Sequence, residues 1–323
     1  MSLQVKDLNV VYKVGKGSIK AINGVDFELM KGDSLGVIGE TGSGKTTIAN
    51  AIMRSLPENA EFFGNIFFNN KDILKMNLET YRREIRWKKI SIIPQYSMNA
   101  FNPIKRIGEQ LVKIMMENDS NIDTSKASER IFYLFNQLNL PPEIYKKYPD
   151  ELSGGQRQRV VIASALLLDP ELVIADEPTT ALDVINQARV VSLIKREIVD
   201  KRKTLIYITH DIAVVAGIAK KVMTLYAGEI MEFGDSKKIF KEPLHPYSKG
   251  LLASVPDIRL GKTKKLQYIP GDPPDLSKEI RGCPFAPRCP VAMDKCKVER
   301  PRLRYVDGRL VACHLVGGEE IVQ

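Results

Sequence analysis

Apolar residues follow two different spacings along this chain of 323 residues. Residues 3–14 have the short-period spacing of a strand, and continuous apolar runs of buried-strand length follow at 34–38, 90–93, 172–175 and 204–208. Elsewhere apolar residues recur every three or four positions, as they do on one face of a helix. Strands and helices in this alternation predict an α/β fold.

The composition changes between residues 107 and 148, where helical spacing dominates. We expect an inserted helical subdomain there, spanning about residues 97–168 and broken by Pro141 and Pro142. The remaining spacing predicts helices at 45–56, 81–89, 157–168, 184–199 and 247–255, and strands at 22–29 and 62–68.

The most specific motif is Gly39–Thr46, which reads GETGSGKT and fits the phosphate-binding pattern G-x-x-x-x-G-K-[ST] at every fixed position. An apolar strand precedes it and a helical pattern follows it, which is the context that the motif requires. Gly42 and Gly44 let the backbone approach a phosphate where a Cβ would collide. The loop N–H groups and the helix N-terminus supply positive partial charge. We expect Lys45 to reach the β and γ phosphates and Thr46 to ligate Mg²⁺.

Two carboxylates, Asp176 and Glu177, end the apolar run at 172–175. An acid pair can simply cap a loop, but downstream of a complete phosphate-binding motif this is the weaker interpretation. We predict that Asp176 holds the Mg²⁺ shell and that Glu177 activates or orients the attacking water.

Four further positions are ambiguous when each is judged alone. Tyr12 could stack on an adenine, and Gln95, directly after a strand, could bind Mg²⁺ and water. Ser153, followed by two glycines and a helix, could donate to a phosphate, and His210 could contact the γ-phosphate. Each residue also has a commoner structural role in a strand, a loop or a helix cap.

The order of these motifs resembles the family of ABC ATPases over roughly residues 1–255. The letters LSGGQ at 152–156 lie between the phosphate-binding loop and the strand that ends in Asp-Glu, as the signature of that family does, and seven motifs follow the family's order. The resemblance implies ATP contacts from Tyr12, Gly39, Glu40, Thr41, Gly42, Ser43, Gly44, Lys45, Thr46 and Thr47, Mg²⁺ contacts from Thr46, Gln95 and Asp176, catalytic roles for Glu177, His210 and Gln95, and contacts with the nucleotide of a partner from Leu152, Ser153, Gly154, Gly155, Gln156 and Asp183.

Composition and charge restrict the possible functions. The length suits two domains, or one large domain with an appendage. Lys and Arg exceed Asp and Glu by 48 to 39, a net charge of +9 that fits nucleic acid, an anionic membrane surface or simply a lysine-rich exterior. No apolar run reaches the ~18 residues of a membrane span, and residues 1–12 lack an apolar signal core. We therefore expect a cytosolic protein that reaches a membrane through partners.

The chain after residue 243 narrows the resemblance. Leu244–Leu252 reads LHPYSKGLL and resembles a C-terminal motif of oligopeptide and dipeptide importer ATPases. Without that resemblance, His245 and Pro246 merely cap an apolar helix. Residues 256–281 are rich in proline, lysine and glycine and predict an exposed linker, in which Pro270–Pro274 also resembles that subfamily.

All cysteines of the chain lie in its last part, with five, six and sixteen residues between Cys283, Cys289, Cys296 and Cys313. Four clustered thiols in a cytosolic chain indicate a metal site, and that compartment disfavours disulfides. The short C-x₂₋₄-C pairs of structural zinc and the C-x₂-C-x₂-C run of ferredoxins are both missing, so spacing leaves the metal open. The tail resembles that of dipeptide importer ATPases with a [4Fe–4S] cluster, which favours iron–sulfur over Zn²⁺.

Two expectations follow for the cysteine segment. Residues 282–315 contain few large apolar side chains, so we expect a metal to hold them together. No cysteine lies in a nucleotide motif, so ATP hydrolysis should survive cysteine replacement.

The sequence as a whole thus predicts an α/β P-loop NTPase of the ABC ATPase type with an inserted helical subdomain and a small cysteine-rich extension. Its parts are residues 1–255 for nucleotide binding, 256–281 as a linker and 282–323 as a Cys₄ metal-binding extension. The resemblance implies the cofactors ATP and Mg²⁺. It also implies a second ATPase subunit (hetero- or homodimer), two membrane permease subunits and an extracellular solute-binding protein, with the chain on the cytoplasmic face of the cell membrane.

The function implied by the resemblance is ATP-driven uptake of di- or oligopeptides or a related solute. Oligosaccharides and metal complexes remain open as cargo. A soluble ABC ATPase acting on nucleic acid or ribosomes is the alternative from another class. It is disfavoured by the single nucleotide domain, the lack of a long coiled-coil pattern and the C-terminal motif, so we expect no nucleic-acid partner.

Overall fold

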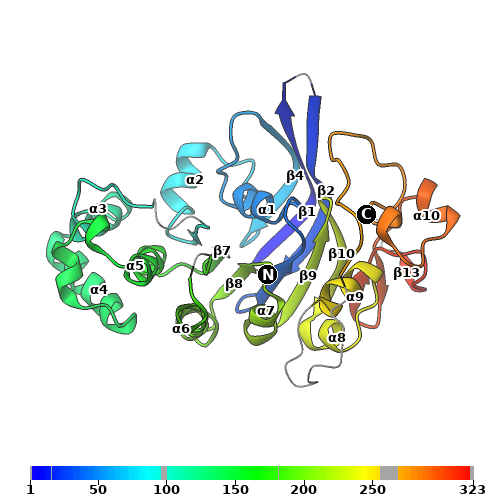
Figure 1. Ribbon diagram of the computed structural model, residues 1–323. Helices are drawn as coiled ribbons and strands as arrows, with labels where there is room; N and C mark the ends of the chain where they lie inside the picture. Colours follow the sequence, from blue (N-terminus) through cyan, green and yellow to red (C-terminus); the bar gives the residue numbers. More distant parts are fainter. Residues whose placement is uncertain (1, 16, 96–99, 181, 255–267, 321–323) are drawn as a thin grey trace.

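The computed structural model describes residues 2–15, 17–95, 100–180, 182–254 and 268–320 (Figure 1). Its strands are β1 (Leu3–Val14), β2 (Gly17–Leu29), β3 (Ser34–Ile38), β4 (Ala60–Phe68), β5 (Lys71–Asp72), β6 (Ile90–Ile93), β7 (Leu172–Asp176), β8 (Thr204–Ile208), β9 (Lys221–Tyr226), β10 (Glu229–Asp235), β11 (Arg304–Val306), β12 (Arg309–Val311) and β13 (Glu319–Glu320).

The helices are α1 (Lys45–Ile52), α2 (Leu78–Glu84), α3 (Ile107–Asn118), α4 (Thr124–Gln137), α5 (Gly154–Leu166), α6 (Val184–Ile194), α7 (Ile212–Ile218), α8 (Ser236–Lys241), α9 (Pro246–Ala253) and α10 (Asp294–Val298). Short 3₁₀ turns lie at Pro142–Lys146, Pro149–Glu151 and Ala286–Arg288, and a π-helical turn at Lys195–Val199 prolongs α6.

Among the described residues, nine strands form the main sheet in the order β13-β11-β12-β10-β9-β3-β8-β7-β6. Strands β9, β3, β8, β7 and β6 pair in parallel, whereas the pairs from β9 to β13 are antiparallel. All residues of β3, β7 and β8 are buried, as expected of parallel strands covered on both faces. The continuous apolar runs in the sequence are therefore explained by burial on both sides.

A smaller antiparallel sheet, in the order β2-β1-β4-β5, covers one face of this core. Helix α1 lies between the two sheets, where Ile48 and Ile52 pack with Leu3 and Leu8 of β1 in one apolar cluster (Figure 1). The phosphate-binding loop therefore leads into a helix that is packed on two sides.

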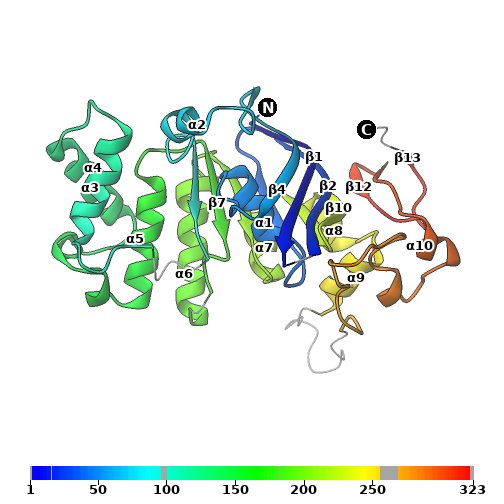
Figure 2. The same cartoon turned by 90° about the horizontal axis from the view of Figure 1, so that it is seen from above.

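The opposite face of the main sheet is covered by a second apolar cluster, which joins α3, α4 and α5 to α6 and α7. Helices α3, α4 and α5 follow β6 and precede β7 in the chain and stand together beside the sheet (Figure 1). Figure 2 shows α3 and α4 at one end of the molecule and α10 with β13 at the other.

Several helices begin or end at other residues than the spacing predicts. Helix α1 ends at Ile52, before the expected residue 56, because the chain turns at Arg54, whose φ is +47°. Helix α2 begins at Leu78, before the expected residue 81, because Asn77 caps it and its side chain accepts from the Glu79 N–H at 2.8 Å. Strands β1, β6 and β8 have the bounds that the sequence predicts.

The C-terminal residues continue the main sheet, since β12 pairs with β10 through Phe233–Leu310 and Glu232–Val311. Val311 is fully buried and Phe285 nearly so. The segment around the cysteines is therefore held by the sheet and by apolar packing, and does not depend on a metal alone as its composition suggests. Residues 256–267 of the expected linker lie outside the described residues, as do residues 97–99 at the start of the expected helical subdomain.

Candidate functional site

Four functional segments meet at one edge of the main sheet, because its parallel strands all point there. The phosphate-binding loop follows β3, Gln95 follows β6, Glu177 follows β7 and His210 follows β8. Ligands of open α/β sheets bind at this carboxyl edge of the strands. The sequence spacing predicts each segment, and the parallel pairing brings them together.

The phosphate-binding loop is closed by its own lysine. Lys45 Nζ donates to the carbonyl oxygens of Gly39 and Glu40, each at 2.9 Å. Gly44 has a φ of +101°, and a Cβ there would lie 2.6 Å from the Ala21 oxygen. Gly42 has a φ of +81° but meets no protein atom within 4 Å, so backbone conformation, and not crowding by the protein, requires glycine at this position.

The residues predicted for Mg²⁺ lie next to each other. Thr46 Oγ1 donates to Asp176 Oδ1 at 3.3 Å. Burial raises the pKa of Asp176 to about 6, opposed by this hydrogen bond. Burial also lowers the pKa of Lys45, which the carboxylate of Glu177 opposes. A hydroxyl and a carboxylate oxygen suit Mg²⁺, and a divalent cation would favour the ionised form of Asp176.

Glu177 is the centre of a hydrogen-bond network. Its Oε2 accepts from Gln95 Nε2 at 2.9 Å and from Thr180 Oγ1 at 3.1 Å, while His210 Nδ1 lies 3.5 Å from its Oε1. The φ of Glu177 is +44°, a left-handed conformation that is uncommon for a side-chain-bearing residue. The structure thus brings the three residues predicted to be catalytic together around the carboxylate of Glu177.

Comparison with known proteins gives the family. An ABC transporter family matches residues 22–180, and an oligopeptide/dipeptide transporter C-terminal region matches residues 231–296. The oligopeptide transport ATP-binding protein OppD of Escherichia coli is 42% identical over 313 residues, covering 96% of this chain and 92% of that protein. The chain belongs to the ATP-binding proteins of oligopeptide/dipeptide ABC transporters.

Two further similarities agree with this family. The dipeptide transport ATP-binding protein DppD of Caldanaerobacter subterraneus subsp. tengcongensis is 40% identical over 316 residues, covering 97% of this chain and 96% of that protein. A solved dimeric ATP-binding cassette in a post-hydrolysis state, bound to ADP and phosphate, covers 72% of this chain and 98% of its own with a TM-score of 0.65 and 26% identity. The chain is thus an ABC ATPase.

The tyrosine predicted to stack on adenine lies beside the phosphate-binding helix of this ABC ATPase. The Tyr12 hydroxyl donates to Thr47 Oγ1 at 3.3 Å. Tyr12 comes near the end of β1, where it pairs with Ala60 of β4. The small antiparallel sheet thus brings an aromatic ring next to the predicted phosphate-binding loop.

The residues predicted to contact the nucleotide of a partner belong to a different part of the fold. Ser153 caps α5, its Oγ accepting from the Gln156 N–H at 3.3 Å while Gln156 Oε1 accepts from the Ser153 N–H at 3.0 Å. Asp183 caps α6 and accepts from the Asn186 N–H at 2.9 Å. In the described part of the chain, no hydrogen bond joins either cap to Gly39–Thr46.

Sequence reasoning missed three residues at the nucleotide site. Thr180 holds Glu177, and its only sequence signal is a hydroxyl three positions after the acid. The Glu40 N–H donates to the hydroxyl of Tyr247 at 2.9 Å, and the Glu40 carboxylate accepts from Arg288. Tyr247 and Arg288 lie more than 200 positions from Glu40 in the chain, so no local pattern could have indicated them.

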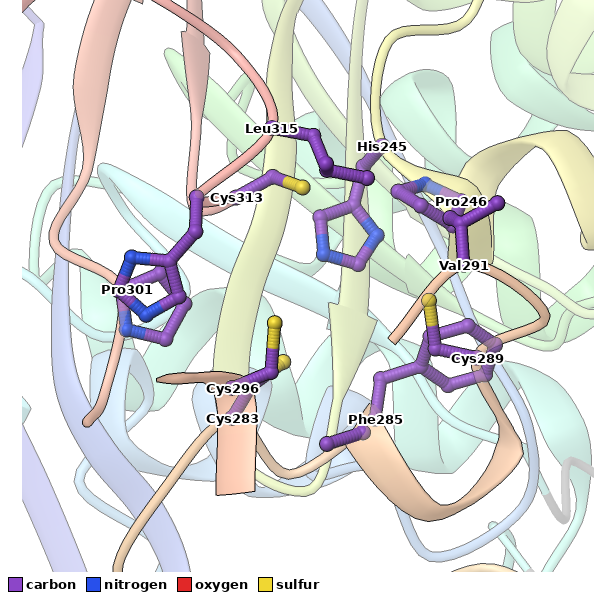
Figure 3. Close-up of a pocket in the computed structure, with 12 residues that line it drawn as sticks. His245, Pro246, Cys283, Phe285, Cys289, Val291, Cys296, Pro301, Cys313 and Leu315 are labelled. Atoms are coloured by element: carbon purple, nitrogen blue, oxygen red, sulfur yellow. The ribbon is translucent and has the colours of Figure 1, made fainter. Parts of the chain in front are cut away.

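The four cysteines, all from the C-terminal part of the chain, line one small cavity (Figure 3). All four are free thiols, and burial raises the pKa of Cys283 to about 11. His245, which the sequence analysis treated as a helix cap, also lines the cavity, and burial lowers its pKa to about 3. Its Nδ1 accepts from the Tyr247 N–H at 3.0 Å, so it does act as that cap.

The predicted metal site is not confirmed. Within the residues that the structure describes, no group of three or more His, Cys, Asp or Glu side chains has the arrangement of a metal site. The donor types nevertheless fit a thiophilic metal, since four thiols from separate stretches converge on one apolar cavity. The same described residues include no helix with the length and apolar character of a membrane span.

Proposed function

We propose that this ABC ATPase hydrolyses ATP to drive the import of di- or oligopeptides. The observation that carries hydrolysis is the Glu177 network, which holds a carboxylate beside the Thr46–Asp176 pair. The observation that supports peptide cargo is the match of residues 231–296 to the C-terminal region of oligopeptide/dipeptide transporters. Oligosaccharides and metal complexes are the alternative cargo classes.

Each site residue then has a chemical role. Gly39–Thr46 with Thr47 bind the phosphates, and Tyr12 stacks on the adenine. Thr46, Gln95 and Asp176 would hold Mg²⁺, which when bound would spread the charge that develops on the phosphates. Glu177 accepts a proton from the attacking water or orients it, while His210 and Gln95 fix the water and the carboxylate in place. The Glu177 network and the Thr46–Asp176 pair support the roles in hydrolysis and Mg²⁺ binding, whereas the stacking role of Tyr12 follows from the resemblance to the family.

The signature residues serve a neighbouring subunit. Ser153 of the Leu152–Gln156 signature and Asp183 each cap a helix start and are exposed, and within the described residues neither is hydrogen-bonded to the loop of its own chain. A helix start is suited to a phosphate. We infer a head-to-tail pair of ATPase subunits, identical or related, in which each nucleotide lies between Gly39–Thr46 of one chain and Ser153–Gln156 of the other.

The arrangement of the chain follows this role. Residues 1–255 form the nucleotide-binding domain, with residues 97–168 as its helical subdomain, 256–281 as a linker and 282–323 as the cysteine-rich extension. Motion at Gln95 passes to two integral membrane permease subunits. The protein acts peripherally at the cytoplasmic face of the cell membrane, and an extracellular solute-binding protein delivers the cargo.

An uptake assay tests the cargo. In a strain that lacks this gene, uptake of labelled di- and oligopeptides should fall to background and return with the wild-type gene, while oligosaccharide and metal-complex uptake stays unchanged. Purification of the tagged protein should also recover integral membrane permeases in fixed stoichiometry. Peptide uptake that is unaffected by the deletion would contradict the cargo, and nucleic-acid-stimulated ATPase activity without any permease would favour a different class of ABC ATPase.

We further propose that Cys283, Cys289, Cys296 and Cys313 hold a [4Fe–4S] cluster, with Zn²⁺ as the alternative. Four thiolates are the usual ligand set of such a cluster, and the converging thiols supply it without any other donor. Because the four thiols come from separate stretches of the chain, a metal bound to all of them would tie these stretches together, and the metal and the folded segment would stabilise each other. The cluster would act here as a structural tie.

Anaerobically purified protein should therefore be brown, absorb near ~400 nm and contain about four irons per chain, as cysteine-ligated iron–sulfur clusters do. Replacing any of the four cysteines by Ser should bleach it. His314→Ala is the matched control, because His314 lines the same cavity but its Nε2 contacts the Glu299 oxygen at 2.9 Å. One zinc and no iron by elemental analysis would establish the zinc alternative. If the analysis finds neither metal, the proposal of a metal site is wrong.

A further inference from the structure

Arg288 joins the cysteine segment to the phosphate-binding loop. It stands one residue before Cys289, at the end of the 3₁₀ turn Ala286–Arg288. Its Nη1 lies 2.6 Å from Glu40 Oε2 and its Nη2 lies 3.1 Å from Glu40 Oε1, a two-pronged ion pair between residues 248 positions apart. The Arg288 side chain is only 7% exposed.

The rest of the guanidinium is also bonded. Arg288 Nε donates to the Pro270 oxygen at 2.9 Å, Nη2 to the Ile269 oxygen at 3.2 Å, and Nη1 to the Tyr226 hydroxyl at 3.2 Å. A planar guanidinium held at every nitrogen has little freedom to leave its carboxylate partner. Its orientation toward Glu40 is therefore fixed by the C-terminal part of the chain.

Glu40 is the second residue of the phosphate-binding loop, and four groups hold it. Arg288 binds its carboxylate, the Tyr247 hydroxyl accepts from its N–H, and its carbonyl oxygen accepts from Lys45 Nζ at 2.9 Å and from the Ser43 N–H at 3.2 Å. Arg288 thus anchors Glu40, which in turn contacts the phosphate-binding lysine, Lys45. A shift of Glu40 would displace both the lysine and the loop amides.

Aromatic packing seats the turn that carries Arg288. Phe285 lies edge-on to Tyr226 and at 61° to Tyr247, with ring centroids 5.3 Å apart in both pairs. Tyr226 and Tyr247 are themselves hydrogen-bonded to Arg288 and Glu40, respectively. The contact between the cysteine segment and the loop is therefore a packed unit, and not an isolated surface ion pair.

We propose that Arg288 is a positioning residue for ATP binding, which fixes the phosphate-binding loop through Glu40. The cysteine segment thereby sets the ATP affinity of the chain to which it belongs. Arg288 need not touch the nucleotide for this role. The proposal goes beyond transport of peptides, since it concerns ATP affinity whatever the cargo is, and it does not depend on which metal the cysteines bind.

Binding of MgATP to purified Arg288→Met and Glu40→Gln proteins, measured by isothermal titration, tests the proposal. Each variant should bind MgATP about tenfold more weakly, a typical size for coupling between sites. The double variant should be no weaker than either single one, because both remove the same contact. Arg288→Lys keeps the positive charge but cannot make the two-pronged contact with the Glu40 carboxylate. Its MgATP affinity should therefore lie between those of the wild type and Arg288→Met.

The KM for ATP should rise with the binding loss while kcat stays within about twofold, because positioning without contact to the reacting atoms removes binding and not catalysis. Arg300→Met is the matched control. Arg300 also ties the C-terminal segment to the body, by an ion pair with Glu229 at 3.0 Å, but within the described residues no hydrogen bond or ion pair joins it to the loop, so ATP affinity should stay at the wild-type value.

Unchanged MgATP affinity in folded Arg288→Met protein would overturn the proposal. If that variant does not fold, Glu40→Gln combined with Arg288→Lys decides, since additive losses would mean that the two residues act separately. A loss of equal size in Arg300→Met would also overturn it, because any loosening of the C-terminal segment would then be sufficient.

Discussion

Glu177→Gln should bind MgATP as tightly as the wild type and lose its steady-state hydrolysis by about 100-fold or more, the scale of lost acid–base assistance. Glutamine keeps the shape of the side chain and an oxygen that can accept from Gln95 and Thr180. It removes the negative charge that would take a proton from water. A coupled phosphate-release assay measures the turnover, and size-exclusion chromatography with ATP should show a trapped dimer.

Glu171→Gln is the matched control for this variant. Glu171 immediately precedes β7 at its other end, where its Oε1 pairs with Lys89 Nζ at 2.6 Å, far from the carboxyl edge of the sheet. Its replacement should leave turnover near the wild-type value. Wild-type turnover in Glu177→Gln protein would contradict the catalytic assignment.

Lys45→Ala should weaken MgATP binding by about 10- to 100-fold, because a hydrogen bond to a charged group contributes about 1.5–3 kcal/mol. In the structure the ammonium group bonds to the oxygens of Gly39 and Glu40, at the position where the phosphates must enter the loop. Isothermal titration measures the affinity, and circular dichroism checks that the fold persists.

Lys220→Ala provides the comparison for this second variant. Lys220 Nζ donates to the carbonyl oxygen of Gly32 at 3.2 Å, also beside β3 but before the strand begins. We expect no change of ATP affinity there. Equal affinities of Lys45→Ala and wild-type protein would show that the loop does not bind phosphate through this lysine.

The contact between Arg288 and Glu40 changes one expectation drawn from the sequence. Since no cysteine lies in a nucleotide motif, the sequence predicts that ATP hydrolysis is independent of the cysteines. Arg288 directly precedes Cys289 and is bonded to the phosphate-binding loop, so loosening of the cysteine segment should reach the loop. Cysteine variants should therefore be examined for ATP affinity as well as for metal content.

The sequence alone determined the local elements of the nucleotide site. The glycine spacing of Gly39–Thr46 requires a particular backbone conformation, and the short, mostly apolar runs at 34–38, 90–93, 172–175 and 204–208 predict buried strands. Gln95, Glu177 and His210 each follow such a strand, so their placement at strand ends could be predicted. Their functional roles came from the order of motifs, which resembles one family.

Only the tertiary structure decided which side chains meet. Strand pairing across the main sheet brings Gln95 to Glu177, and the pairing of β12 with β10 brings the C-terminal segment back to the body. Contacts such as Arg288 with Glu40 depend on packing between residues 248 positions apart, which leaves no periodic or local trace in the sequence. Local patterns specify elements because backbone conformation is a local property, whereas the partners of a side chain depend on how the whole chain closes around its core.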